Sequence, residues 1–392
     1  MKYWRGFIVA AALALMAWAL TEFAAAHGAL VDMIYPYASR LIQDFLADWA
    51  AQAPFCLWQM LVIVMGVALL ASIVVMIILR WNFVQWLGWV LSGVCLLWCL
   101  HTGVYGLNQY GSPLAEDIRL TIEPDITTTD LVNATTYFRD KANEFAVQVP
   151  RNATGRVEIG TFSEVAEQAG DGFYNLVYNK NYAVFAGTRT PVKELGWADM
   201  YTSMGISGVT MPLTGEAAVN PQTPAVALPF TICHEMAHRM CIAPERDANL
   251  AAYLATTNNT DIVYQYSGYF MAFRYCYNAL ASISTTTAST AANRIMEGVD
   301  PYLQADLDHY RAYYAAVQDA GATQLATNVN NAYIQASGDE SGVRSYGEVA
   351  DLLISWYLQD IYLPLHADDE TEDIFDPLDK EDVFITEETG GK

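Results

Sequence analysis

The chain of 392 residues is 53% apolar and 16% charged, with 20 Lys and Arg residues against 43 Asp and Glu residues. This composition excludes a disordered or collagen-like chain, and it is poorer in charge than a typical soluble protein, which carries about 25% charged residues. The net charge of −23 arises entirely after residue 112, and this acidity argues against nucleic acid as a partner, because phosphate binding needs basic patches.

Three apolar stretches, at about residues 6–26, 57–79 and 83–105, are each long enough to cross about 30 Å of hydrocarbon as a helix. They predict a transmembrane region, 1–112, whose partner is the lipid bilayer. The first stretch has a basic start and small residues near its end, so it also fits a cleaved signal peptide. We expect the intervening segment 27–56 to be a loop.

Basic residues beside the apolar stretches predict the orientation in the membrane. Lys2 and Arg5 favour a cytoplasmic N-terminus, and Arg80 favours a cytoplasmic turn between the second and third stretches. We therefore expect a multi-pass cell-membrane protein whose domain of residues 113–366 lies outside the cytoplasm. Residues 367–392 form an acidic segment with too few apolar groups to fold alone, and they are interpreted as a disordered tail.

The patterning of residues 113–366 predicts a mainly helical α+β domain with a small sheet. Apolar spacing of helical type and short β-rich runs bounded by glycine distinguish the two kinds of element. Helices are expected at 130–149, at 229–280 with breaks near Pro244 and Asn258, at 300–320 and at 346–363, and short strands at 172–187 and 203–213.

The sequence HEMAH, at 234–238, is the sharpest motif in the chain. Four residues are about one helical turn, so His234 and His238 project from one face of a helix and can bind one Zn²⁺ through imidazole nitrogens. Glu235 lies beside them, where it would contact a metal-bound water and act as the general base. The apolar residues on both sides suit a buried helix, and Pro229 fits its first turn.

A third protein ligand is expected because catalytic zinc sites commonly have three. Pro244 breaks the helix, and Glu245 begins a second helix that can fold back toward the histidines. We expect Glu245 to be this ligand, since Asp247 would point about 200° away around the helix. Asn249, one turn further, would hydrogen-bond a ligand. The alternative for Glu245 is an ordinary acidic residue at a helix start.

Segment 213–220 is interpreted as an edge strand that precedes the zinc helix. Zinc peptidases often bind a peptide by adding it as an extra strand to such an edge. The candidate substrate-binding residues are therefore Gly215, Glu216, Ala217 and Asn220. A plain loop or a core strand is the alternative.

Two residues near the start of the last predicted helix are candidates for a catalytic hydrogen-bond donor. An enzyme that forms an oxyanion needs a donor aimed at it. Tyr346 is the first candidate for this role and Arg344 the second, both within a Gly- and Ser-rich stretch. The alternative is that this stretch only caps the helix.

The ExxAN sequence at 245–249, shortly after HExxH, resembles the gluzincin-type metallopeptidases, whose third zinc ligand is a glutamate. Over about residues 1–363 the chain also resembles a bacterial membrane family known as domain of unknown function 3810. The segments that match are GVYGLNQYGSPLAE (103–116), GISGVTMPLTGEAAVN (205–220), PFTICHEMAHRMCIAPERDANLAAYLA (229–255), YSGYF (266–270) and SGVRSYGEVADLLI (341–354). The resemblance implies a zinc-dependent hydrolase domain with a zincin-like fold behind three membrane helices. Near position 241, where we expect a glycine in this family, the chain has Cys241.

These features predict a membrane-anchored zinc metallopeptidase that acts on a peptide or protein substrate. Hydrolysis would proceed by metal-activated water, without a covalent enzyme intermediate. The alternative is a catalytically inactive metal-binding sensor, or an assembly or scaffold protein of the cell envelope. The presence of Glu235 argues against a sensor, because a purely structural site has no need of a general base.

Overall fold

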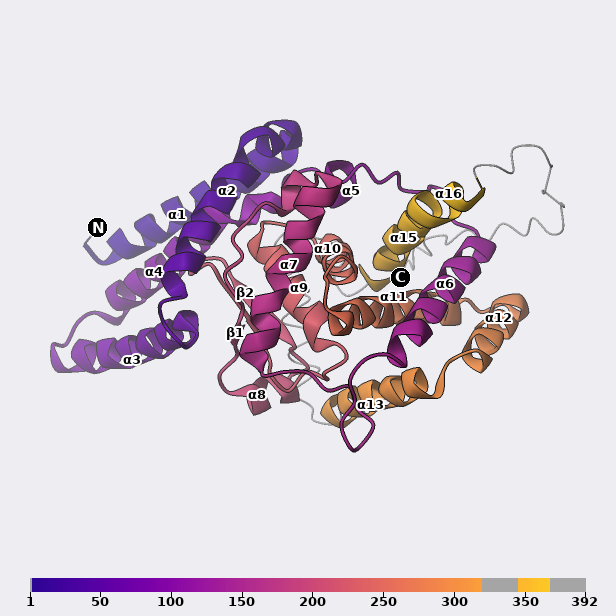
Figure 1. Cartoon of the computed structure of the whole chain (residues 1–392). Helices are drawn as coiled ribbons and strands as arrows, with labels where there is room; N and C mark the ends of the chain where they lie inside the picture. Colours follow the sequence, from indigo (N-terminus) through magenta and orange to yellow (C-terminus); the bar gives the residue numbers. More distant parts are fainter. Residues whose placement is uncertain (1, 319–344, 367–392) are drawn as a thin grey trace.

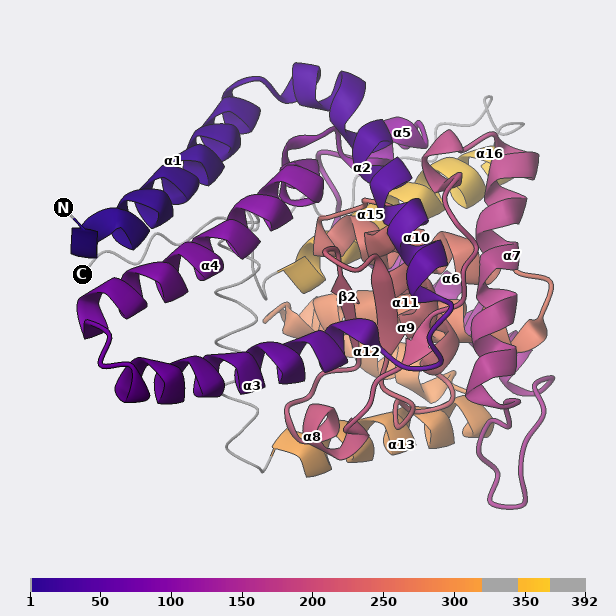
Figure 2. The same cartoon turned by 90° about the vertical axis from the view of Figure 1, so that its left-hand side faces the viewer.

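The computed structural model describes residues 2–318 and 345–366 and shows a mainly helical protein with one small sheet (Figure 1). The N-terminal part extends to one side of the globular part (Figures 1 and 2). It consists of η1 (Lys2–Trp4), α1 (Arg5–Ala26), α2 (Gly28–Ala50), α3 (Leu57–Ile78), α4 (Phe83–Val104) and η2 (Gly106–Tyr110).

Helices α1, α3 and α4 are long and apolar enough to cross a membrane, by length and composition, and most of their large side chains are exposed. Their bounds agree with the three predicted stretches to within about one residue. Helices α1 and α4 pack closely at two glycines. A Cβ on Gly6 would lie only 2.4 Å from the backbone of Gly88, so the close approach requires glycine there. Ser92 Oγ also donates a hydrogen bond to the carbonyl of Gly6 at 2.7 Å. These helices indicate association with a membrane.

Most of segment 27–56 is a helix, so the loop predicted there is wrong. Helix α2 crosses the globular part between the end of α1 and the start of α3 (Figure 2). The prediction overlooked the amphipathic pattern that the segment carries, and Pro36 within it argues locally against a continuous helix.

The globular part is centred on α9 (Leu228–Arg239), α10 (Glu245–Thr257) and α11 (Ile262–Ser282), which contact one another. They are covered by α6 (Thr128–Ala146), α7 (Phe162–Lys180) and α15 (Ser345–Tyr357). The breaks predicted near Pro244 and Asn258 are confirmed, and the helix predicted at 130–149 is α6. The other helices of this part are α5 (Leu114–Asp117), α8 (Ala198–Ser203), α12 (Thr286–Glu297), α13 (Pro301–Gln318) and α16 (Leu363–His366), with the 3-10 turn η3 (Ala183–Phe185) and the π-helical segment η5 (Leu358–Tyr362).

Residues 172–187 are not the strand that we predicted. They form the second half of α7 and the turn η3. The glycine that suggested a strand end, Gly172, lies where α7 crosses α10, and a Cβ there would lie 2.0 Å from the carbonyl oxygen of Ala255. The glycine is therefore required for close helix packing and not for a turn.

The sheet has three short strands, β1 (Lys193–Glu194), β2 (Gly208–Met211) and β3 (Glu216–Val219), in the order β1-β3-β2. Strand β1 pairs parallel with β3, and β2 pairs antiparallel with it, with Val209 opposite Ala218. The central strand is thus β3, and both β2 and β3 contact α9. The sheet covers one side of the helix that carries the HExxH motif.

Gly172→Ala tests the close crossing of α7 and α10. We expect a lower melting temperature, because overpacking against backbone typically costs about 1–3 kcal/mol. Gly170→Ala, in the same helix, is the matched control, since its Cβ would meet only the movable side chain of Arg189, with Nε at 3.1 Å. Thermal unfolding of the full chain in detergent measures both. A melting temperature of Gly172→Ala at or above that of Gly170→Ala would contradict the crossing.

Candidate metal site

Helix α9 is held rigidly in the core. Pro229 lies in its first turn, as predicted, and every residue of the helix except His234 is buried. The helix contacts α7, α10, α11 and strands β2 and β3. Packing on so many sides fixes the rotation of α9 and hence the direction in which its polar side chains project.

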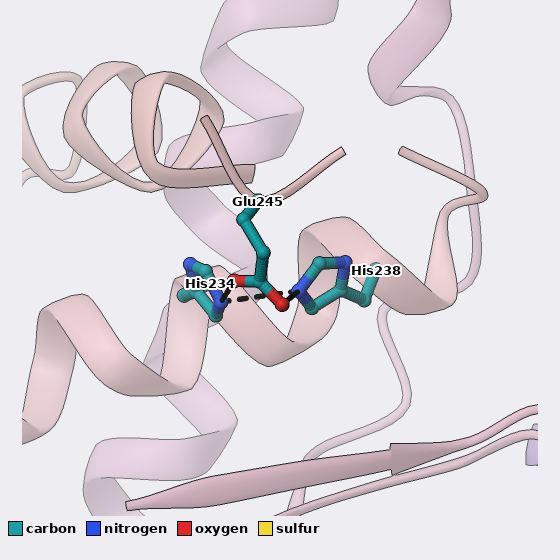
Figure 3. Close-up of side chains that lie close together, drawn as sticks. All are labelled: His234, His238 and Glu245. Carbon is teal, nitrogen blue, oxygen red and sulfur yellow. Dashed lines mark hydrogen bonds and ion pairs between the residues drawn. The ribbon is translucent and has the colours of Figure 1, made fainter. Parts of the chain in front are cut away.

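Three candidate ligands converge where α9 and α10 meet. His234 and His238 lie one turn apart on α9, with their Nε2 atoms 3.1 Å from each other, and Glu245 is the first residue of α10. The Glu245 carboxylate lies between the two imidazoles, with Oε2 3.3 Å from His234 Nε2 and Oε1 3.6 Å from His238 Nε2 (Figure 3). One ligand atom from each residue falls within 4.8 Å of the others, a spacing that can hold a metal ion.

The chain reverses between α9 and α10 through a Schellman motif. The N–H of Cys241 donates to the carbonyl of His238 at 2.9 Å, and the N–H of Ile242 donates to that of Ala237 at 3.1 Å. Cys241 has a φ of 71°, in the left-handed region where glycine is usual. This explains the glycine expected here from the family resemblance. The turn directs the carbonyl of Ile242 toward the ring of His238.

This turn fixes the tautomer that His238 adopts when its ring is neutral. Its Nδ1 lies 2.9 Å from the carbonyl oxygen of Ile242, which can only accept a hydrogen bond. The proton of the neutral ring therefore sits on Nδ1, and Nε2 presents its lone pair to His234 and Glu245. Metal-ligating histidines are commonly oriented by such a bond to a backbone carbonyl.

The donor set fits a zinc ion. Two imidazole nitrogens that face each other at 3.1 Å need a proton or a cation between them. Two histidines and one carboxylate are a known ligand set of catalytic zinc. His234 Nδ1 is buried and has no hydrogen-bond partner within the described ranges.

Electrostatics also favour a cation between the three residues. Burial opposes ionisation of Glu245, but the two neighbouring histidines outweigh it and hold the pKa of this carboxyl well below its usual range. Burial lowers the pKa of His238, but Glu245 and Glu235 outweigh it and raise the pKa to about 9. The carboxylate is thus ionised and attracts positive charge, which a metal ion supplies as well as a proton does.

Glu235 lies beside the three ligands but points to the sheet. Its Oε2 accepts a hydrogen bond from Thr210 Oγ1 at 2.7 Å, and a Cβ on Gly208 would lie 2.3 Å from its Oε1. Burial raises the pKa of Glu235, while His234, His238 and the bond from Thr210 act in the opposite direction. Gly208 and Thr210 of β2 were not predicted as site residues, because nothing in the strand pattern distinguishes them from the other residues of the strand.

Asn249 supports Glu245 through the main chain. Its Nδ2 donates to the backbone carbonyl of Glu245 at 2.9 Å, and its Oδ1 accepts a bond from Tyr275 Oη at 2.9 Å. We expected Asn249 to bond a ligand side chain, and the structure places it on the backbone of that residue. Asp247 points elsewhere and accepts a hydrogen bond from the N–H of Leu114 at 3.0 Å.

The segment that we predicted to be an edge strand is the centre of the sheet. Strand β3 is hydrogen-bonded on both sides, so its main chain cannot accept a further strand, and the prediction is wrong. The carboxylate of Glu216 instead accepts hydrogen bonds from the N–H groups of Leu57 and Trp58, both at 2.8 Å, and pairs with Lys193 Nζ at 2.7 Å. It therefore stabilises the first turn of α3.

The three other residues predicted to bind substrate are also structural. Ala217 is buried in the core, and Asn220 is buried and donates to Thr202 Oγ1 at 2.8 Å. Gly215 has a φ of 66°, and a Cβ there would lie 2.6 Å from the backbone nitrogen of Ala47 in α2. Gly215 thus allows the β2–β3 turn to contact α2.

The two candidate oxyanion donors are not placed. Arg344 lies outside the described residues. Tyr346 belongs to the first turn of α15, but its side chain lies outside the described part of the chain.

Comparison with curated proteins finds no match, and comparison with solved structures finds none either. A family profile does match the chain, over residues 31–354. This match covers most of the sequence and includes His234, His238 and Glu245. The chain therefore belongs to the family described as "Protein of unknown function (DUF3810)".

Proposed function

We propose that the protein is a membrane-anchored zinc metallopeptidase of gluzincin type, with a zincin-like fold and an active site outside the cytoplasm. The observation that carries the proposal is the convergence of His234, His238 and Glu245 beside the buried carboxylate of Glu235. A structural zinc site would use four protein ligands, whereas a catalytic one keeps a position open for water or substrate. The basic residues Lys2, Arg5 and Arg80 support the orientation.

Zinc held by the three ligands would lower the pKa of a bound water and polarise the scissile carbonyl. Proton transfer falls to Glu235, whose burial raises its pKa and thus makes it a stronger base. Thr210 holds Oε2, and no described residue donates to Oε1. We therefore assign to Oε1 the acceptance of the proton and its transfer to the leaving nitrogen. The absence of a side chain on Gly208 leaves space for that oxygen.

The substrate would bind along β2 and not along β3. Among the described residues β2 pairs only with β3, so its other side is an edge. Thr210 of this strand contacts Glu235, so a peptide added as a further strand would bring its backbone close to the proposed base. Strand addition fits a peptide substrate of extended conformation.

His234→Ala tests the metal site. We expect about one zinc per chain in the wild type and a loss of most of it in the variant, since two protein ligands bind zinc far more weakly than three. His309→Ala, a histidine of α13 outside the cluster, is the matched control and should keep its zinc. Elemental analysis of the full chain in detergent measures the content. No zinc in the wild-type chain after incubation with the metal would contradict the proposal.

Glu235→Gln separates metal binding from chemistry. The amide is isosteric and can still accept the bond from Thr210, but it cannot take a proton. We expect unchanged zinc content and a fall in hydrolysis of about 10²–10⁴-fold, the usual contribution of a general base. Cleavage of a quenched-fluorescence peptide library by the zinc-loaded full chain measures it. Hydrolysis that survives in this variant, or is absent from the zinc-loaded wild type, would refute the peptidase.

Thr210→Val tests the positioning of Glu235. Loss of a hydrogen bond to a charged group is worth about 1.5–3 kcal/mol, so we expect kcat to fall by about 10–100-fold. KM and zinc content should remain close to the wild type, because the Thr210 hydroxyl contacts no candidate ligand and the proposed strand addition uses the main chain of β2, which the substitution leaves in place. Thr210→Ser keeps the hydroxyl and should restore most of the rate. Equal losses in the valine and serine variants would show that shape matters here and not the hydrogen bond.

A further inference from the structure

Helix α2 carries an unusual exposed face. Its exposed positions are all apolar apart from Asp48, and they are Ala29, Leu30, Met33, Ile34, Tyr37, Ala38, Leu41, Ile42, Phe45 and Trp49. Tyr37, Leu41 and Phe45 are 66%, 72% and 70% exposed and follow one another at intervals of four residues, along one side of the helix. A helix that faced water would place polar residues there.

The polar residues of α2 face the globular part. Gln43 Nε2 donates to the carbonyl of Pro212 at 3.1 Å, Ser39 Oγ lies 3.2 Å from Cys241 Sγ, and Asp44 Oδ1 accepts from the N–H of Thr188 at 2.8 Å. Even the exposed Asp48 accepts a hydrogen bond from Thr188 Oγ1 at 2.8 Å. The helix is therefore amphipathic with its polar side against protein and its apolar side outward.

The described globular part has no comparable surface. Eight exposed large apolar residues lie on the 23 residues of α2, whereas nine are distributed over all described residues after α4. Such a concentration on one helix marks an interaction surface and is not the ordinary scatter of exposed apolar side chains.

We infer that the apolar face of α2 lies in the membrane interface, with the lipid bilayer as its occupant. The helix has the features of one that lies in the plane of a membrane, an apolar face opposite a polar one and too little overall hydrophobicity to span. It carries Asp32, Arg40, Asp44 and Asp48, and it is not among the helices that qualify as spans.

The connections of α2 favour lipid over a protein partner. Only His27 separates it from α1, and only residues 51–56 separate it from α3. Six extended residues reach at most about 20 Å, whereas the 23 residues of α2 are about 34 Å long. With α1 and α3 in the membrane, both ends of α2 are thus held near its boundary. Figure 2 shows α2 crossing between them on the side from which the apolar helices extend.

A second group of exposed apolar residues supports this placement. Trp197 and Met200, at the start of α8, are 48% and 46% exposed. The next residue, Tyr201, has its ring 6.5 Å from that of Trp58 in the first turn of α3. Trp and Tyr are enriched where a protein passes through a membrane interface. The globular part therefore meets the bilayer along α2 and α8, and this inference does not depend on the metal.

Spin labels on cysteines introduced at Leu41 and Phe45 test the inference. The full chain is reconstituted in phosphatidylcholine vesicles, and collisions with oxygen, which enters lipid, are compared with collisions with a water-soluble nickel chelate. We expect the nickel-to-oxygen ratio at both positions to be several-fold lower than at Tyr178→Cys. Tyr178 is the matched control because it is 71% exposed and lies on α7, which Figure 2 places away from the apolar helices.

Background labelling of the native cysteines is limited because they are buried, or half-buried in the case of Cys95. A ratio at positions 41 and 45 equal to that at 178 would place α2 in water and overturn the inference. Labels shielded from both reagents would mean that a protein covers the face, which also overturns it. The same face can be tested without a label. Brominated phosphatidylcholine should quench the tryptophan fluorescence of the wild type by a larger fraction than that of Trp49→Phe, because Trp49 lies on this face.

Discussion

The hydrogen bonds from the N–H groups of Cys241 and Ile242 to carbonyls of α9 reverse the chain between the two helices that carry the candidate ligands. This reversal brings Glu245 against His234 and His238, which lie on the preceding helix. It also directs the Ile242 carbonyl to His238 Nδ1 and so fixes which ring nitrogen faces the cluster. The position of Glu245 and the tautomer of the neutral His238 ring thus depend on one turn of five residues, held by backbone geometry.

The same turn connects the site to α2. Cys241 contacts Ser39, and Arg40 Nε donates to the carbonyl of Met240 at 3.4 Å. Arg239, directly after His238, is almost fully buried, and burial lowers its pKa to about 10 while Asp44 and Asp48 of α2 oppose this shift. A buried guanidinium needs such partners, since an isolated charge in a core is strongly unfavourable. Groups on α2 therefore stabilise the end of α9 on which the cluster depends.

Sequence reasoning found what helix geometry alone determines. The spacing of His234 and His238 requires one face of a helix, and Pro244 forces the break after which Glu245 begins α10. The apolar helices were found because their length and composition are local properties. The described positions of Glu245, His234 and His238 agree with the arrangement that this reasoning expected.

Non-local features could not be found in this way. Strand order depends on pairing between distant segments, so the local pattern of β3 does not show that β1 and β2 flank it. Gly172 resembled a turn residue, because the approach of Ala255 from another helix is invisible in the local pattern. The contact of the Thr210 hydroxyl with Glu235 joins two segments that are distant in sequence, so no local pattern indicates it. The residues of α2 are amphipathic at helical spacing, but their pattern does not show that the polar side packs against protein.

The anchoring contacts of α2 also limit how the protein can be divided. A fragment that starts at residue 113 contains the HExxH motif and Glu245, and it would look like a self-sufficient enzyme domain. It would nevertheless lack Ser39, Arg40 and Gln43, which contact Cys241, Met240 and Pro212, and the N–H groups of Leu57 and Trp58 that bind Glu216. Truncation at the apparent domain boundary therefore removes part of the fold, and recombinant work on the site should retain the N-terminal helices.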